Sequence, residues 1–106
     1  MKLAIGNSRM DKVWRNCEMT WDEFCERVSI TTRTPETVAE YRTAKRGQQD
    51  RIKDVGGFVG GWLREGRRKN GNVLCRSMLT LDMDYASPDT WAKMRESVDF
   101  ARCVYS

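Results

Sequence analysis

Hydrophobic residues along this chain follow two spacings, one typical of strands and one typical of helices. Apolar runs or alternations predict strands at residues 2–6, 55–63, 73–85 and 100–105. Within residues 73–85 the alternation makes one face mostly apolar and the other mostly polar. Because the Asn-Gly dipeptide at residues 70–71 is a common hairpin turn, residues 55–63 and 73–85 are expected to form a β-hairpin.

Hydroxyl side chains mark three helix starts. Thr20 and Glu23 have the T-x-x-E form of a capping box, and an apolar stripe follows over residues 21–29. A hydroxyl residue followed by proline, which favours the first turn of a helix, occurs at residues 34–35 and again at residues 87–88. We therefore expect about three helices.

The order of these elements predicts the fold class. It is β-α-α-β-β-α-β, with the hairpin ahead of a helical crossover, which indicates an α+β sandwich of one small sheet covered by helices. With 106 residues the chain has the size of one small domain, residues 1–106. Hydrophobic residues make up 40% of the chain, enough for one core, while 32% charged residues make the surface very polar.

The charge balance and the missing histidine narrow the function classes. Nineteen Lys and Arg against fifteen Asp and Glu give a net charge of +4, which favours partners that carry phosphates or acidic side chains. The sequence contains no histidine. This excludes an imidazole base, a Ser-His or Cys-His nucleophile and a histidine-containing metal site within the chain.

The cysteines and the N-terminus indicate the compartment. Cys17, Cys25, Cys75 and Cys103 are irregularly spaced without a C-x-x-C pair. Buried, reduced thiols are therefore expected rather than a disulfide framework or a four-cysteine zinc site. The apolar run at residues 3–5 is too short for a signal peptide or a membrane span. We expect a cytoplasmic protein with no membrane partner.

Two carboxylates on the longest predicted strand are candidate metal ligands. Asp82 and Asp84 are two residues apart, so a strand places both on one face, with a spacing that suits one or two divalent cations. Metals held in this way stabilise charge in phosphoryl or nucleotidyl transfer. The alternative is a strand end that passes into solvent, where acidic residues need no function.

Two further features flank these carboxylates in the predicted hairpin. Glycine pairs, which strands tolerate where a backbone or a ligand approaches closely, occur at Gly56, Gly57, Gly60 and Gly61. Basic residues gather in the loop and on the strand that follows, at Arg64, Arg67, Arg68, Lys69 and Arg76. Glycine N–H groups and these cations are groups that contact phosphates of nucleotides or nucleic acids. Alternatively, the glycines admit Trp62 or a neighbouring helix, and the basic run is a solvated loop.

Four stretches of the sequence together resemble a known family. They are residues 4–9, 53–61, 66–69 and 76–86. They resemble the N-terminal half of phage and prophage primase-polymerase domains, which belong to the archaeo-eukaryotic primase superfamily and often precede the helicase region of virulence-associated-E-type proteins. The resemblance extends over nearly the whole chain. It implies that Asp82 and Asp84 match the D-x-D metal motif of that family.

The sequence departs from this family after residues 103–106. Relatives continue into a motif with an essential histidine that contacts the incoming nucleotide, and then into a third carboxylate, whereas this chain stops at Ser106. The resemblance therefore implies that the chain alone is not an enzyme. Asp82 and Asp84 are expected to bind Mg²⁺ or Mn²⁺ weakly at most, and no cofactor is required.

Two main functions remain open. The first is a non-catalytic phage-derived binding protein that reuses a primase half-domain, in its most concrete form an anti-CRISPR-type inhibitor of a host nucleic-acid-targeting defence complex. The alternative is the nucleotide- or DNA-binding N-terminal module of a phage replication primase-polymerase, completed by further sequence. A structural or regulatory DNA-binding protein without metal is the third hypothesis.

The partners expected from these hypotheses are a host protein or nucleoprotein complex, or DNA or RNA. A short natural gene product is favoured over a cut fragment, because a cut inside the family's sheet exposes the strand edge at residues 100–105. That edge is expected to pair with a target protein or with a second copy, which gives a homodimer.

Overall fold

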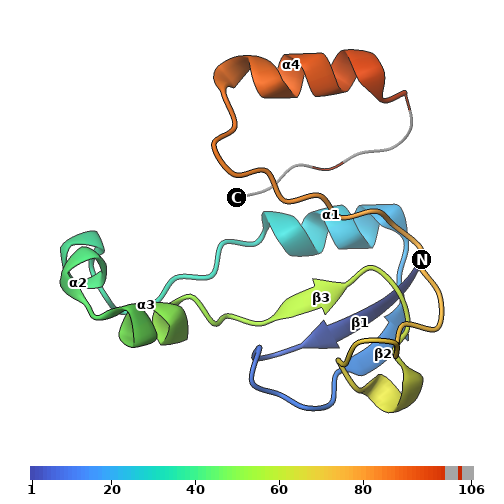
Figure 1. Ribbon diagram of the computed structural model, residues 1–106, viewed down its shortest axis with the longest axis horizontal. Coiled ribbons are helices and arrows are strands. Elements are labelled where there is room, and N and C mark those ends of the chain that lie inside the picture. Colours follow the sequence, from blue (N-terminus) through green and yellow to red (C-terminus); the bar gives the residue numbers. More distant parts are fainter. Residues whose placement is uncertain (100–102, 104–106) are drawn as a thin grey trace.

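A three-stranded antiparallel sheet forms the centre of the computed structural model, which describes residues 1–99 and Cys103 (Figure 1). Its strands are β1 (Lys2–Gly6), β2 (Arg15–Glu18) and β3 (Gly57–Val59), in the order β2-β1-β3. The α+β class and the opening strand are confirmed. β2 was not predicted, because this edge strand is polar and largely exposed and therefore carries no apolar pattern.

The register of β1 assigns its side chains to two faces. Ile5 lies opposite Phe58, so these two share one face, whereas Ala4 and Val59 share the other. Leu3 and Ala4 are fully buried although they point to opposite sides. Both faces of the central strand are therefore covered, which is why Leu3, Ala4 and Ile5 are apolar in succession.

Helix α1 (Trp21–Ser29) covers the Ile5 face. Thr20 and Glu23 form the predicted capping box, with the Thr20 backbone N–H donating to the Glu23 carboxylate over 2.7 Å. Phe24 is the buried residue of this helix, and its ring meets Phe58 edge-on at a centroid distance of 5.0 Å. The prediction of a helix at residues 21–29 is confirmed.

An irregular part of the chain, rather than a helix, covers the Ala4 face. Trp14 and Leu63 pack there as a small buried cluster. The side-chain amide of Asn16, on β2, donates to the Leu63 carbonyl over 2.7 Å and accepts from the Leu63 N–H over 2.9 Å. This pair of hydrogen bonds holds the chain after β3 against β2. The short 3₁₀ helix η1 (Arg64–Gly66) follows.

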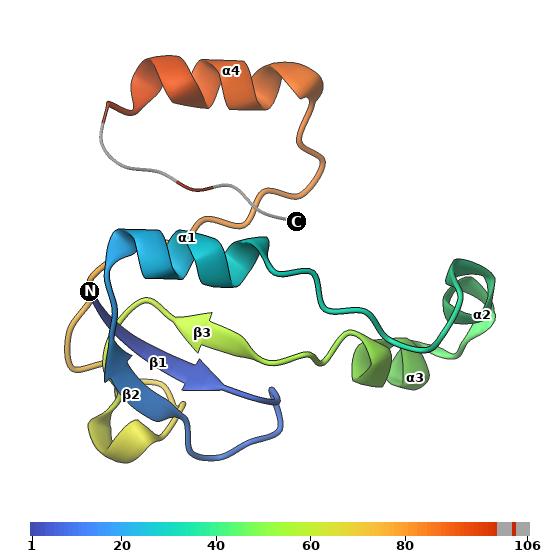
Figure 2. The same cartoon turned by 180° about the vertical axis from the view of Figure 1, so that it is seen from behind.

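Helices α2 (Val38–Thr43) and α3 (Arg46–Ile52) form a projection at one end of the molecule (Figures 1 and 2). We call residues 37–54 the arm. The second helix starts at residue 38 rather than after the predicted signal at residues 34–35, because Thr37 and Glu40 form a reciprocal capping box. Neither helix buries a residue. The radius of gyration, 15.9 Å, exceeds the value of about 13 Å expected for a compact chain of this length, in agreement with this projection.

The predicted hairpin is only partly present. Residues 60–64 run antiparallel to residues 72–78, with an isolated bridge between Leu63 and Val73 and a hydrogen bond of 2.8 Å from the Ser77 N–H to the Gly60 carbonyl. The strand prediction for residues 73–85 is wrong, because this segment is not a strand and its part after residue 78 is exposed.

The ladder does not extend beyond Gly60 and Gly61. The backbone of residues 75–78 crosses over these two glycines and does not run on beside β3. Side chains after this crossing keep their apolar alternation without a covering layer, and Leu79 is 77% exposed. Tyr85 ends the extended segment with a positive φ of 59°. An alternating sequence thus predicts an extended backbone but not a pairing partner.

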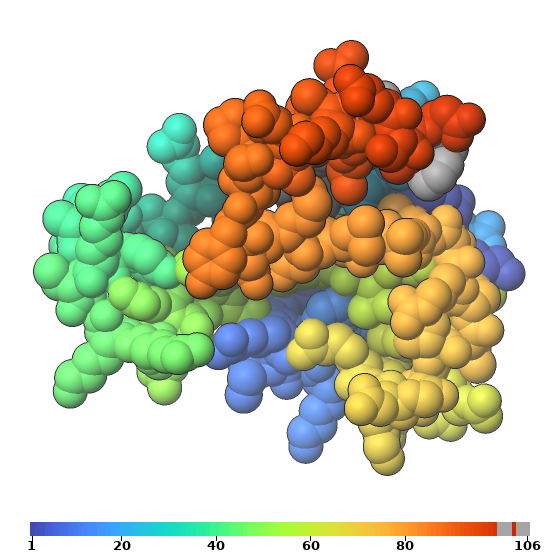
Figure 3. Space-filling view, turned by 45° about the horizontal axis from the view of Figure 1, so that its top comes forward, coloured from blue at the N-terminus to red at the C-terminus, as the bar shows by residue number. Residues whose placement is uncertain are grey.

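Helix α4 (Pro88–Ser97) follows this segment and begins as predicted. The Ser87 N–H donates to the Thr90 hydroxyl over 2.9 Å, and proline occupies the first helical position. Figure 3 shows residues 74–99 running over the surface of the molecule. The predicted strand at residues 100–105, with its proposed homodimer edge, lies outside the described residues apart from Cys103. Among the helices described, none is long and apolar enough to cross a membrane.

The crossing at Gly61 predicts the effect of two glycine substitutions. A methyl group at Gly61 collides with the Cys75 carbonyl, so Gly61→Ala is expected to lower the free energy of unfolding by about 1 to 3 kcal/mol. Gly47, inside α3, has open space around it, so Gly47→Ala is expected to raise that free energy by about 0.5 to 1 kcal/mol. Urea denaturation of the parent and both variants gives the free energies of unfolding. Equal changes in the two variants would contradict the close approach of Cys75 to Gly61.

Candidate functional site

A cleft of 440 Å³ opens beside the loop that connects residues 63 and 76. The more buried part of its lining is apolar and comes from Val59, Leu63 and Val73. Asn70, Gly71 and three exposed cations form the rest of the lining, and the cations are Arg68, Lys69 and Arg76. We call this the basic cleft. Its combination of apolar surface and positive charge suits a ligand that carries both a flat or apolar group and an anion.

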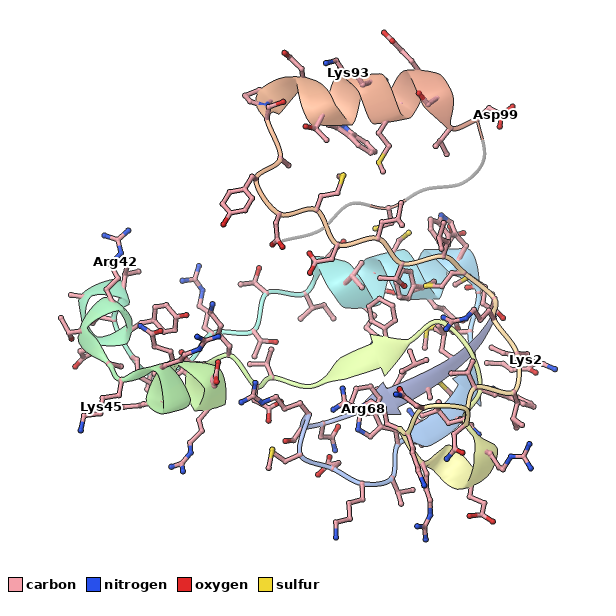
Figure 4. All side chains as sticks on the ribbon, in the orientation of Figure 1. Lys2, Arg42, Lys45, Arg68, Lys93 and Asp99 are labelled. Carbon is pink, nitrogen blue, oxygen red and sulfur yellow. The ribbon has the colours of Figure 1, made fainter. Side chains whose placement is uncertain are left out.

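Arg68 is held in place before any ligand arrives. Its guanidinium group lies over the ring of Trp14, 4.7 Å from the ring centre, and its Nη2 donates to the Arg9 carbonyl over 2.7 Å. The cation–π contact and the hydrogen bond restrict the side chain, which lowers the entropy cost of binding an anion. Figure 4 shows Arg68 directed toward the β1–β2 loop.

That loop is itself fixed by a cluster of polar side chains, which we call the clamp. Ser8 Oγ donates to Asp54 over 2.5 Å, and the Arg9 N–H donates to the same carboxylate over 2.7 Å. The Arg9 guanidinium also pairs with Asp50 at 3.3 Å. The hydrogen bonds from Ser8 and Arg9 hold the pKa of Asp54 below its ordinary value of 3.8. The clamp therefore links Arg9, which orients Arg68, to the end of the arm.

Sequence reasoning did not identify the clamp. Its hydrogen-bonded residues are far apart in the sequence. Ser8 and Asp54 are separated by 46 positions, and Arg9 and Asp54 by 45. The available signal was that residues 4–9 and residues 53–61 belong to the same set of family-like stretches. The first stretch contains Ser8 and Arg9 and the second contains Asp54, so the two stretches were candidates for contact in space.

Three of the five predicted cations line the basic cleft and two do not. Arg64 lies on η1, outside the cleft lining. Arg67 is directed to Glu65 at 3.6 Å, and both side chains are largely exposed. The loop therefore divides its positive charge between the cleft and the open surface.

The predicted glycines lie against the protein's own chain. Gly60 and Gly61 are crossed by residues 75–78, and Gly56, with a φ of +89°, lies against the Gly6 carbonyl. Gly57 faces the ring of Trp14. Close approach by a neighbouring segment, one of the two explanations open from the sequence, accounts for these glycines. Their contact with phosphates stays a prediction.

Asp82 and Asp84 lie on the exposed segment after the crossing. They are not on a strand and do not line the basic cleft. Within the described part of the chain, no cluster of three or more His, Cys, Asp or Glu side chains has a geometry that could hold a metal ion. Weak Mg²⁺ or Mn²⁺ binding by this pair stays a prediction.

The four cysteines are free thiols. Each is half-buried, which is less than the burial expected from the sequence. Burial raises the pKa of the Cys25 thiol above its ordinary value, and the neighbouring Cys103 thiol raises it further. Cys25 is therefore a weak nucleophile at neutral pH.

Comparison with known proteins identifies one family. A family model described as the VapE N-terminal domain matches residues 1–106. The comparisons with curated proteins and with solved structures found no match. The family match covers the sheet, the basic cleft, the clamp and the arm.

The clamp predicts a pH dependence. A carboxylate whose pKa is lower in the folded than in the unfolded protein contributes stability above its ordinary value of 3.8, and this contribution is lost as the pH falls toward the folded-state pKa. Asp54→Asn is therefore expected to lower the melting temperature at neutral pH, with a difference from the parent that shrinks below pH 3.8. Melting curves between neutral and acidic pH measure this.

A matched control is Glu26→Gln, which neutralises an exposed carboxylate on α1. It is expected to change the melting temperature little at either pH. A difference for Asp54→Asn that is equal at neutral and acidic pH would show that the charge of Asp54 does not stabilise the clamp.

Proposed function

The chain belongs to the VapE N-terminal domain family, and we propose that it is a binding module of phage-type DNA replication that takes a nucleotide or a DNA strand into the basic cleft. Membership of the family supports the replication context. The cleft supports the class of ligand, because nucleotides combine an anionic phosphate with a flat base.

The observation that supports this proposal is that cations and apolar side chains line the same cleft. Lys69 and Arg76 offer charge to phosphate oxygens, while Val59 and Val73 offer apolar surface to a base or sugar. Hydrogen bonds of cations to phosphates contribute about 1.5 to 3 kcal/mol each when partly desolvated. Arg68, already oriented by Trp14, provides a fixed donor among these groups.

The family match favours one of the two functions left open by the sequence. An N-terminal domain of VapE type fits the replication alternative, a nucleotide- or DNA-binding module completed by further sequence. The anti-CRISPR-type inhibitor finds no support in the match. Descent from a primase-polymerase remains part of the proposal and rests on the family-like stretches quoted above.

Binding at the cleft is tested with neighbouring cations of the same loop. Lys69→Ala with Arg76→Ala is expected to weaken binding of a labelled single-stranded oligonucleotide about tenfold or more and to reduce the salt dependence, because about two phosphate contacts are lost. Arg64→Ala with Arg67→Ala removes the same charge outside the cleft and is expected to have a smaller effect. Fluorescence anisotropy at two salt concentrations provides the affinities.

Two results bear directly on the cleft. Equal losses in both double variants would show that net charge alone drives binding, and the proposal would fail. Asp82→Asn with Asp84→Asn is expected to leave binding nearly unchanged, because this pair lies outside the cleft. A loss confined to the aspartate variant would assign binding to a metal-dependent site instead.

We also propose that the chain alone does not synthesise primers. The resemblance assigns nucleotide contact to a histidine, and this sequence has none. Purified protein incubated with a single-stranded template, nucleotides and Mg²⁺ or Mn²⁺ is expected to give no extension product on a sequencing gel. Template-dependent incorporation that Asp82→Ala abolishes would overturn this part of the proposal.

A further inference from the structure

The arm carries a second set of cations, apart from the basic cleft. Among residues 37–54 there are five Lys and Arg against three Asp and Glu. Figures 1 and 2 show the arm at the end of the molecule opposite the η1 loop. In Figure 4 Arg42 and Lys45 extend outward from it. The arm is therefore a separate charged surface rather than a rim of the cleft.

The three carboxylates of the arm are all engaged within the protein. Glu40 accepts the Thr37 N–H over 2.6 Å in the capping box, and this hydrogen bond holds the pKa of Glu40 below its ordinary value. Asp50 pairs with Arg9 at 3.3 Å, and Asp54 belongs to the clamp. Each negative charge is thus used to cap the arm or to attach it to the β1–β2 loop.

The cations of the arm are left facing solvent. Lys53 lies over the Tyr41 ring at 5.2 Å, and the remaining four are exposed, namely Arg42, Lys45, Arg46 and Arg51. None of these four forms an ion pair with a carboxylate of the described residues. A surface on which cations outnumber carboxylates raises the local positive potential, which attracts polyanions.

The composition of the arm distinguishes between classes of polyanion. Stable protein interfaces need a desolvated centre with aromatic or apolar anchors, and single-stranded nucleic acids are held largely by bases stacked on exposed aromatic rings. The aromatic residue of the arm, Tyr41, is half-buried beneath Lys53. Val38 is an exposed apolar residue of the arm, but one aliphatic side chain is too small to form a desolvated centre. Contacts to a duplex backbone need neither anchors nor stacking.

We propose that the arm binds the sugar-phosphate backbone of duplex DNA through Arg42, Lys45 and Arg46. The contact is independent of the nucleotide or strand in the basic cleft and does not depend on base sequence. It holds the protein on double-stranded DNA by charge, because the arm carries five cations against three carboxylates, and each carboxylate already accepts a hydrogen bond or forms an ion pair within the protein.

The test uses the whole chain and a labelled blunt duplex of about 20 base pairs, with affinities from fluorescence anisotropy between 50 and 200 mM salt. The triple variant Arg42→Ala, Lys45→Ala and Arg46→Ala is expected to lose about tenfold or more in affinity. The slope of log affinity against log salt is expected to flatten by about 2.7, which corresponds to about 0.9 for each lost phosphate contact.

A control of equal charge removes three exposed cations elsewhere, Lys12→Ala, Lys93→Ala and Arg95→Ala. It is expected to retain most of the affinity. Arg42→Lys with Arg46→Lys keeps the charge of the arm and is expected to retain the salt slope of the parent, which separates loss of charge from loss of helix. Circular dichroism checks that the triple variant is folded.

Three outcomes would overturn the inference. They are equal loss in the control triple, failure of the parent to bind the duplex, and arm-dependent binding of poly-glutamate as tight as that of the duplex, which would assign the arm to acidic proteins. The cleft variant Lys69→Ala with Arg76→Ala is measured on the same duplex. The cleft variant can leave the arm-dependent affinity for the duplex unchanged and also bind single-stranded oligonucleotide as tightly as the parent. In that case the proposed function of the cleft fails and the inference about the arm stands.

Discussion

The indole ring of Trp14 is the constraint on which the remaining structure depends. It occupies the space that a side chain at Gly6 would fill, and it also contacts Gly57, which lies opposite Gly6 on β3. The backbone N–H of Trp14 donates to the Gly66 carbonyl over 2.7 Å, which fixes η1 against the sheet. Because Arg68 rests on the same ring, the packing that closes the small core also orients a cation of the basic cleft.

The loop between β1 and β2 connects Arg68 to the arm through Arg9. The carbonyl of Arg9 accepts from Arg68, its N–H donates to Asp54, and its guanidinium pairs with Asp50. The Asp50 ion pair is exposed, so it contributes less than about 1 kcal/mol by itself. The carboxylate that accepts from both Ser8 and Arg9 has the better geometry, and it is the group on which attachment of the arm depends.

Local signals in the sequence predicted much of the fold, but long-range pairing was not predictable. The capping box at Thr20 and the Ser-Pro start at residues 87–88 act within one helical turn, so the sequence alone identified them. The alternation of residues 73–85 was equally clear, yet the crossing over Gly61 decides that it does not become a strand. Long-range contacts limited the prediction of the site in the same way. The sequence predicted the basic residues of the loop, but it did not show that Arg68 lies on the Trp14 ring while Arg67 is directed to Glu65.

The basic cleft and the arm differ in what surrounds their cations. In the cleft the cations stand beside apolar side chains, and Arg68 is fixed on the Trp14 ring, which favours one geometry of a bound anion. On the arm the cations face solvent, and charge contacts of that kind do not select a base sequence. The two surfaces are connected through Arg9, whose carbonyl accepts from Arg68 of the cleft and whose guanidinium pairs with Asp50 of the arm. Because one residue holds both, the position of the β1–β2 loop determines how Arg68 is placed relative to the arm.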